Sequence, residues 1–193
     1  MSDLPIGITF WFWVVLEVGL RTRDRVRGKG TTGSDRGTRM FIGITIIGAT
    51  VVAQVAATTL RGHTSLRLGS GTGGWQVSAG LVMMWLGLAV RIWAVVVLGG
   101  AFRTTVEVDP DQQLVDWGPY RWIRHPSYTG LVLASAGFGL ALGNWLSLAV
   151  ALLVPLGGLA RRIQVEEQVL VFSMGPSYAA YRKRTKRLIP GIW

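Results

Sequence analysis

The chain has 193 residues, of which 50% are hydrophobic and only 16% charged, and its mean hydropathy is +0.40. This balance is typical of an integral membrane protein and argues against a soluble domain. The absence of cysteine excludes disulfides, thiolate metal sites and a cysteine nucleophile. With only two histidines as well, we expect no His-built metal centre and predict no metal-site residues, although carboxylates could still bind Mg²⁺. The formal charge of +10 suits either nucleic acid or an anionic membrane surface, so the placement of the charges has to decide.

Three apolar segments predict the first membrane helices: Leu4–Leu20, Met40–Leu60 and Trp75–Phe102. The first two are close to the roughly 20 residues that cross a bilayer as a helix, and the third is longer. The first segment has no basic stretch before it and no small-residue cleavage site after it, so we expect it to remain as a membrane helix.

A fourth apolar region, residues 128–159, is too long for one membrane helix and short for two full spans of roughly 20 residues each. The turn residues Gly143 and Asn144 lie near its middle. We therefore predict a tight hairpin over 129–159, with helices 129–142 and 145–159. Pro155 is expected to loosen the second helix near its end.

The basic residues are divided unevenly among the loops that these segments define. Of the 20 Lys and Arg residues, 17 follow the first segment, the third segment or the hairpin. Two, Arg61 and Arg67, lie between the second and third segments, and Arg91 lies inside the third. Because cytoplasmic loops are enriched in basic residues, we predict that the 17 face the cytosol and that the N-terminus lies outside. We expect the anionic lipids of the bilayer as a partner and no nucleic acid, since a nucleic-acid binder needs no such partition. The Arg-rich, Lys-poor composition favours the cytoplasmic membrane of a bacterium.

A glycine-rich stretch, residues 69–74, formally matches the dinucleotide motif G-x-G-x-x-G. That motif requires a strand before it and a helix after it in a βαβ unit. Here it lies in a predicted outer loop between two membrane segments, which favours a connector. The predicted fold is therefore all-α: a polytopic membrane protein with about five transmembrane helices and no Rossmann domain. Within this single membrane domain, 1–102 carries three helices and 103–193 the hairpin and the denser polar segments.

Residues 118–130 (G-P-Y-R-W-I-R-H-P-S-Y-T-G) crowd polar groups directly before the hairpin. Such groups are costly beside a membrane segment and usually serve a ligand. The following proline keeps His125 out of a helix, which leaves its ring free to point at a ligand. We expect Ser127 to cap a helix that begins near Tyr128, with backbone N–H groups available to an anion. An aromatic belt at the lipid headgroups is the competing interpretation.

A second cluster, residues 161–168 (R-R-I-Q-V-E-E-Q), lies on the same predicted side of the membrane. Arg162 and Glu166 are four residues apart and therefore share a helix face. The tail that follows predicts a short amphipathic helix with Tyr178 and Tyr181 on one face. The basic residues after it favour an interfacial helix held by anionic lipid.

Glu17, Gln54 and Arg91 are polar residues inside predicted membrane segments. A pairing of Glu17 with Arg91 would neutralise both charges and would be structural.

In their order, these motifs resemble the isoprenylcysteine carboxyl methyltransferase family. The matching series is G-P-Y-x-x-x-R-H-P-S-Y-x-G at 118–130, an apolar hairpin, R-x-x-x-E-E at 162–167, F-x-x-G-x-x-Y-x-x-Y at 172–181, and a terminal L-I-P. The resemblance covers about residues 103–193. It implies S-adenosylmethionine (SAM) as cofactor, bound on the cytosolic side without a Rossmann domain. Arg162 matches the family arginine near the substrate, and with Glu166 it forms the predicted catalytic pair. The cofactor-binding residues that the resemblance implies are Thr105, Gln112, Gln113, Leu114, Val115, Tyr120, His125, Pro126, Ser127, Tyr128 and Glu166.

The resemblance implies methyl transfer from SAM to a lipophilic acceptor, with an isoprenylcysteine-like carboxylate as the first expectation and a methyl ester as product. A phospholipid amine or a thiol is the alternative acceptor within the same fold. An NADPH-dependent membrane reductase of the sterol reductase type and a non-catalytic lipid-binding protein are alternatives from other classes.

Overall fold

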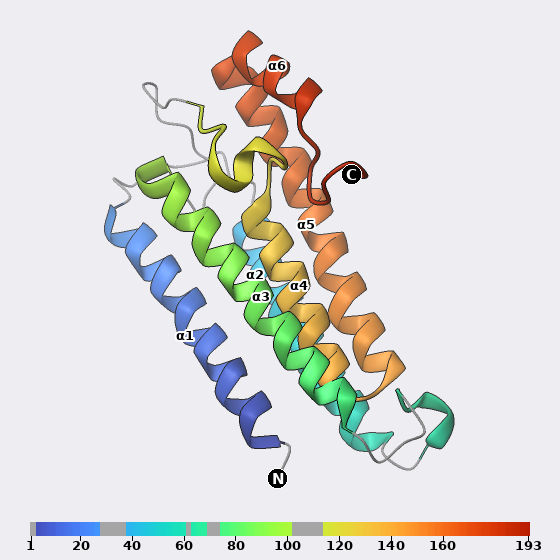
Figure 1. Cartoon of the computed structure of the whole chain (residues 1–193). Coiled ribbons are helices and arrows are strands. Elements are labelled where there is room, and N and C mark those ends of the chain that lie inside the picture. The colour runs from blue at the N-terminus through green and yellow to red at the C-terminus, as the bar shows by residue number, and fades with distance from the viewer. Residues whose placement is uncertain (1–2, 28–37, 61–62, 69–73, 102–113) are drawn as a thin grey trace.

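A computed structural model of the chain describes residues 3–27, 38–60, 63–68, 74–101 and 114–193. Over these residues the chain is all-helical apart from two isolated backbone bridges, which confirms the predicted class. Five long helices lie side by side, and a sixth, short helix follows at one end (Figure 1). The long helices are α1 (Asp3–Arg27), α2 (Thr38–Thr59), α3 (Trp75–Leu98), α4 (Pro126–Ala141) and α5 (Trp145–Met174), and the short one is α6 (Pro176–Arg184). Single turns of 3-10 helix form η1 (Thr64–Leu66), η2 (Gly99–Ala101) and η3 (Gly118–Arg121).

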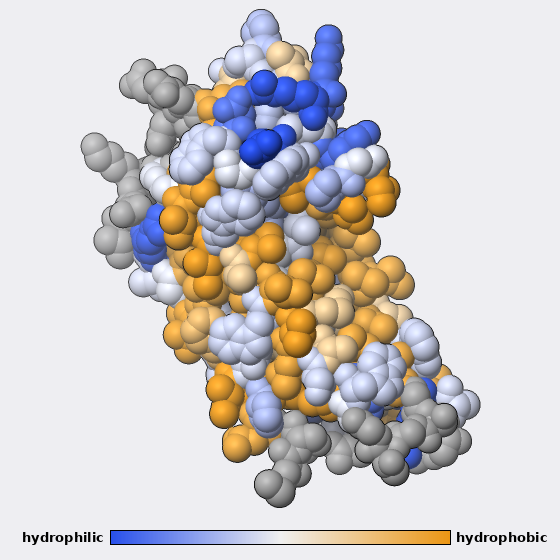
Figure 2. Space-filling model, in the orientation of Figure 1, coloured by the Kyte–Doolittle hydropathy of each residue, from blue (hydrophilic) through white to orange (hydrophobic). Residues whose placement is uncertain are grey.

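Four of these helices, α1, α2, α3 and α5, are long and apolar enough to cross a membrane. At 16 residues, α4 is about 24 Å long and falls short of a hydrocarbon core of about 30 Å. On the face that Figure 2 shows, apolar residues cover the middle of the bundle and hydrophilic residues gather at the end that carries α6. We call this end, where α3 finishes and α4 starts, the basic end. The chain is therefore a polytopic membrane protein.

The turn of the predicted hairpin is confirmed, but the end of its second helix is wrong. Gly143 adopts a φ of 69°, and the Asn144 side chain caps α5 by accepting from the backbone N–H groups of Leu146 and Ser147. The second helix does not stop at Leu159: α5 continues to Met174 with Pro155 inside it. A proline removes one backbone hydrogen bond from the helix. A membrane helix can keep such a proline when neighbouring helices pack against it, as α2 and α4 do here.

Glycines bring α3 and α4 into backbone contact along a seam. A Cβ atom on Gly87 would lie 2.5 Å from the Ala134 nitrogen, and one on Gly130 would lie 2.5 Å from the Gly87 carbonyl oxygen. One level down, Gly80 and Gly137 meet in the same way. Small residues at a seven-residue repeat let two membrane helices approach this closely, where packing rather than a hydrophobic drive holds them together. The seam sets the first turn of α4 directly beside Arg91.

In contrast, α1 is attached loosely. Only 11% of its apolar span is buried, against 39% for α3 and for α5. Its main helix contacts are with α3 and α4, through rings such as Phe10, which packs on Phe138 with centroids 5.2 Å apart. Between α1 and α2 runs a narrow hollow of about 120 Å³, which we call the α1–α2 slot. Its walls are mostly apolar: Phe10, Trp13, Val14, Glu17, Val18 and Arg21 from α1, and Gly43, Ile46, Ile47 and Thr50 from α2.

Candidate active site

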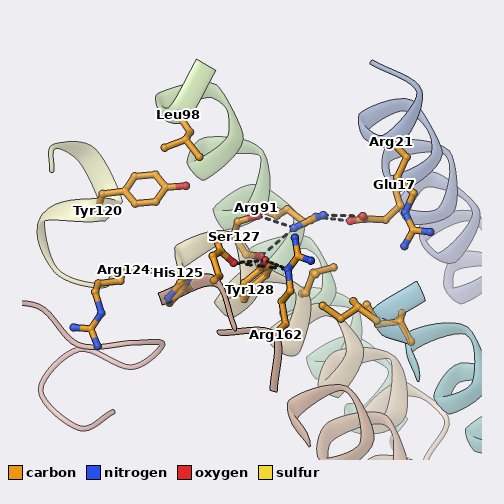
Figure 3. Close-up of a pocket in the computed structure, with 14 residues that line it drawn as sticks. Glu17, Arg21, Arg91, Leu98, Tyr120, Arg124, His125, Ser127, Tyr128 and Arg162 are labelled. Atoms are coloured by element: carbon orange, nitrogen blue, oxygen red, sulfur yellow. Dashed lines mark hydrogen bonds and ion pairs between the residues drawn. The ribbon is translucent and has the colours of Figure 1, made fainter. Parts of the chain in front are cut away.

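A cavity of about 100 Å³ lies at the basic end, among all five long helices and η3. Figure 3 shows its polar side chains, contributed by α1, α3, α4 and α5 and by the segment before α4. The lining residues are Glu17, Arg21, Ile42, Ile46, Arg91, Leu98, Tyr120, Arg124, His125, Ser127, Tyr128, Leu131, Arg162 and Glu166. The two sequence clusters that we expected to cooperate, 118–130 and 161–168, therefore meet in one place.

The strand-like segment before α4 is held by the C-terminal tail. The backbone N–H of Arg124 donates to the Lys186 carbonyl at 2.7 Å, and that of His125 donates to the Arg187 carbonyl at 3.0 Å. In return, the Lys186 N–H donates to the Trp122 carbonyl at 3.2 Å. These bonds satisfy backbone groups of residues 122–125, which lie between η3 and α4, and they set the position of His125.

The buried carboxylate of Glu167 joins the same segment, the tail and α5. It is 3% exposed and accepts from Arg124 Nε at 2.8 Å and from an Arg187 guanidinium nitrogen at 3.0 Å. His125 Nε2 lies 3.5 Å from it. In the sequence, Glu167 is a member of the second cluster with no role of its own; in the structure it links the segment before α4, the tail and α5.

Tyr128, Arg162 and Glu166 form a polar triad across α4 and α5. The Tyr128 hydroxyl donates to Glu166 Oε2 at 2.7 Å and accepts from Arg162 Nε at 3.3 Å. The Arg162 side chain is 2% exposed and lies 3.9 Å from Glu166 Oε2, whereas Glu166 is 27% exposed. The tyrosine ring also stacks on His125, with centroids 5.5 Å apart and planes 10° from parallel. The predicted sharing of one helix face by Arg162 and Glu166 is confirmed, and Tyr128 bridges the pair.

Arg91 and Glu17 form an ion pair, a pairing that the sequence allowed but did not establish. Two guanidinium nitrogens of Arg91 donate to the two carboxylate oxygens of Glu17, the longer bond being 2.7 Å (Figure 3). The third nitrogen donates to Ser127 Oγ at 2.6 Å. The pair thus joins α1, α3 and α4 at the wall of the cavity, which is more than the neutralisation we expected.

The predicted capping role of Ser127 is wrong. The helix begins at Pro126, two residues earlier than expected, and its N-cap residue is His125. Ser127 instead lies inside the first turn, where its hydroxyl accepts a hydrogen bond from Arg91. The N–H groups of Tyr128 and Thr129 both donate to the His125 carbonyl, at 3.0 and 3.1 Å, so they are already satisfied. The start of α4 is therefore a poorer anion site than its sequence suggested.

The remaining predicted cofactor residues divide into three groups. Tyr120 lines the cavity, but its hydroxyl donates to the Ala94 carbonyl at 3.3 Å. Burial raises the pKa of this hydroxyl far above its ordinary value, so it stays protonated and cannot serve as a base. Three described residues do not line the cavity: Pro126 is buried at the start of α4, Val115 packs against Tyr120, and Leu114 is half-buried. Thr105, Gln112 and Gln113 lie outside the described residues.

Our sequence analysis left four charged lining residues out of the site: Glu17, Arg21, Arg91 and Arg124. For Glu17 and Arg91 a signal was present, because an ionisable residue inside an apolar segment marks a functional site by default. Arg21 ends the first apolar segment and looked like an ordinary flanking charge, so only the packing of α1 reveals its position.

Comparison with known proteins gives one consistent result. Residues 80–172, which cover most of α3, all of α4 and most of α5, match the sequence model of the isoprenylcysteine carboxyl methyltransferase (ICMT) family. The protein-S-isoprenylcysteine O-methyltransferase of Schizosaccharomyces pombe is 38% identical over 120 residues, which are 61% of this chain and 50% of that protein. A probable protein-S-isoprenylcysteine O-methyltransferase of Oryza sativa subsp. indica is 34% identical over 121 residues, 61% of this chain and 63% of that protein.

The fold is also similar to a solved structure. A structure of the eukaryotic intramembrane Ras methyltransferase ICMT superposes with a TM-score of 0.66 at 30% identity, over 75% of this chain and 51% of that one. The chain thus spans about half to three fifths of the length of these relatives. Motifs, sequence model and fold agree, and the resemblance of this chain to the isoprenylcysteine carboxyl methyltransferase family is confirmed over residues 80–172.

Proposed function

We propose that the chain is a membrane methyltransferase that moves a methyl group from SAM to a carboxylate on a lipophilic, isoprenylcysteine-like acceptor and forms a methyl ester. One observation carries the proposal. The triad of Tyr128, Arg162 and Glu166 lies within the region that matches the family, in a cavity that shares Glu17, Arg21 and Ile46 with the apolar α1–α2 slot. A polar reaction centre continuous with an apolar hollow suits an acceptor that has a polar head and an apolar tail.

The balance of charge supports an anionic acceptor. Four arginines line the cavity against two glutamates, which leaves an excess of positive charge. A carboxylate is already ionised at neutral pH, so its methylation requires no general base. The protein then has to hold the acceptor in line with the methyl group and keep water out. We assign the orienting role to Arg162, whose guanidinium is held by Tyr128 and Glu166.

The residues present suit SAM in chemistry, and the described cavity accounts for part of its volume. The half-exposed carboxylate of Glu166 would bind a hydroxyl or ammonium group of the cofactor, and the stacked rings of His125 and Tyr128 offer flat surfaces. A cavity of about 100 Å³ is smaller than the roughly 300 Å³ of a typical small-molecule site, so further residues must complete it. When bound, SAM would supply a methyl group already activated by its sulfonium. We propose Tyr120, His125, Tyr128 and Glu166 as the part of its site that the described residues contribute.

We also propose that the basic end faces the cytosol. The predicted cytosolic segments, which include the start of α4, the end of α5 and α6, lie together at this end, opposite the N-terminus (Figure 1). The positive-inside rule places such an end in the cytosol, where SAM would be supplied.

Binding and transfer measured separately test this proposal. Detergent-purified protein should bind radiolabelled SAM and not NADPH. With SAM bound, it should form a base-labile methyl ester on a prenylated cysteine acid and leave matched lipophilic thiols and amines unlabelled. Binding of NADPH alone would identify a reductase, and transfer to the thiol or amine would change the acceptor class.

A further inference from the structure

Arg21 differs from the other arginines that line the cavity. Arg91 is paired with Glu17, Arg124 with Glu167, and Arg162 with Glu166. Among the described residues, Arg21 forms no hydrogen bond or ion pair, although it is half-buried at the wall of the cavity. A guanidinium withdrawn from water without a partner is costly, so the structure leaves one cation available for an anion.

The missing partner is a consequence of how α1 packs. Glu17 precedes Arg21 by four residues, a spacing that commonly gives an ion pair on a helix surface. Here both oxygens of the Glu17 carboxylate accept hydrogen bonds from Arg91 of α3 instead. Arg21 is left facing the other way, toward α2, as Figure 3 shows.

On α2, a glycine makes room for this guanidinium. A Cβ atom on Gly43 would lie 3.0 Å from one terminal nitrogen of Arg21 and 3.3 Å from the other. Gly43 also lines the α1–α2 slot, and Arg21 lines both the slot and the cavity. Arg21 therefore stands where the apolar slot opens into the polar cavity, with the reaction triad on one side and apolar walls on the other.

We infer that Arg21 recognises the carboxylate of the acceptor, and that the acceptor's apolar chain lies in the α1–α2 slot. This rests on the proposed function for the identity of the acceptor. Arg21 would select acids over neutral acceptors, because its charge is unpaired, whereas Arg162, already paired with Glu166, orients the bound carboxylate for transfer. Recognition of the acceptor would thus come from α1, outside the residues that match the family, and methyl transfer from residues within them.

The test separates affinity for the acceptor from turnover. The probes are tritiated N-acetyl-S-farnesylcysteine and its uncharged primary amide, with protein in lipid nanodiscs. Loss of a charge-assisted contact should weaken binding of the acid to Arg21→Gln and raise its KM by about 10- to 100-fold. Three quantities should change by less than about threefold: the affinity for the amide, kcat and the affinity for SAM. This limit is well below the effect expected from losing the charge-assisted contact. Arg21→Lys should restore part of the affinity, and Gly43→Ala, which crowds the guanidinium, should show a smaller loss for the acid only.

Arg121→Gln is the matched control, because Arg121 is an exposed arginine at the same end that stacks on Trp122 and does not line the cavity. Equal losses for acid and amide in Arg21→Gln would mean damage to the slot and overturn the inference. So would unchanged binding of the acid, or failure of the wild-type protein to bind it. If the wild-type protein binds the acid through Arg21 but forms no ester with SAM, the inference stands and the proposed function falls.

Discussion

The α3–α4 pair and the α1–α2 edge are built on opposite principles. Along the seam, Gly87 and Gly130 bring two backbones together so closely that no Cβ fits. Along the other edge, α1 is 11% buried over its span and leaves a slot against α2. The close pair holds the first turn of α4 against Arg91 of α3. Under the proposed function this close packing positions Tyr128, since catalysis tolerates little displacement. The loose edge lies outside the residues that match the family, and its slot is where we propose that the acceptor's apolar chain lies.

The largest effect should come from filling the seam. Gly87→Leu forces side-chain atoms into the Ala134 backbone, and we expect a loss of about 3 kcal/mol or more in the free energy of unfolding, enough to prevent recovery of folded protein. Gly19→Leu on α1 is the matched control, because nothing lies within 4 Å of a Cβ there. Thermal melting in detergent, followed by size-exclusion chromatography, measures both. Equal melting of the two variants would remove the contrast between the regions.

Next in size is the ion pair that attaches the loose edge to the close pair. Glu17→Ala leaves the Arg91 guanidinium, 6% exposed, without its counterion, which should cost about 3 kcal/mol. Because α1 has few other contacts, the loss should appear first as movement of α1. The chain has no native cysteine, so Val14→Cys in the slot wall reports this movement through its maleimide labelling rate.

That rate should rise in the Glu17→Ala background. Asp116→Ala, which breaks an ion pair between side chains 47% and 60% exposed, should leave labelling and melting nearly unchanged. If labelling of Val14→Cys stays slow without Glu17, other contacts must hold α1.

In the polar triad, Arg162→Ala on α5 should reduce kcat by about 100-fold at saturating SAM while the protein stays folded, because the acceptor would lose its orientation. Arg161→Ala is the neighbouring control: Arg161 is exposed and lies over the Phe41 ring, 5.5 Å from its centroid. Methyl transfer by Arg162→Ala at the wild-type rate would show that this arginine has no orienting role.

The smallest effects concern the tail that closes the site. Burial raises the pKa of Tyr178 and of Tyr181 above the ordinary value of about 10. A raised pKa in the folded state contributes stability below pH 10, and this contribution is lost as the pH rises further, so the melting temperature should fall above pH 10. Tyr181→Phe removes a 2.7 Å bond to the Tyr120 carbonyl and should cost about 1 kcal/mol.

Tyr178→Phe is its counterpart. The Tyr178 hydroxyl is buried without a partner among the described residues, so its removal should leave stability unchanged or slightly higher. Both variants should flatten the loss of stability above pH 10. A larger destabilisation by Tyr178→Phe than by Tyr181→Phe would contradict the assigned hydrogen bonding.

Much of the architecture was predictable because apolar length is a strong signal in a membrane. The first three helices and the turn at Gly143–Asn144 lie where the sequence predicts them. The true end of α5, at Met174 rather than Leu159, was not predictable from hydropathy. The helix continues because its later residues, such as Ile163 and Glu167, are buried against the rest of the structure. The division of the chain at residue 102 stays a prediction.

For the site, the sequence determined which residues are chemically suited and predicted that they gather on one side of the membrane; that this side is the cytosol stays a proposal. The ordered motifs were sufficient to indicate the family, because such a series rarely arises from hydropathy alone. Only the tertiary structure decided which of these groups are already engaged. The Ser127 hydroxyl accepts from Arg91, and Glu17 pairs with Arg91 rather than with Arg21. The backbone N–H groups of Tyr128 and Thr129 donate to the His125 carbonyl. Pairing depends on distances of a few ångströms between different helices, and those distances follow from how the helices pack.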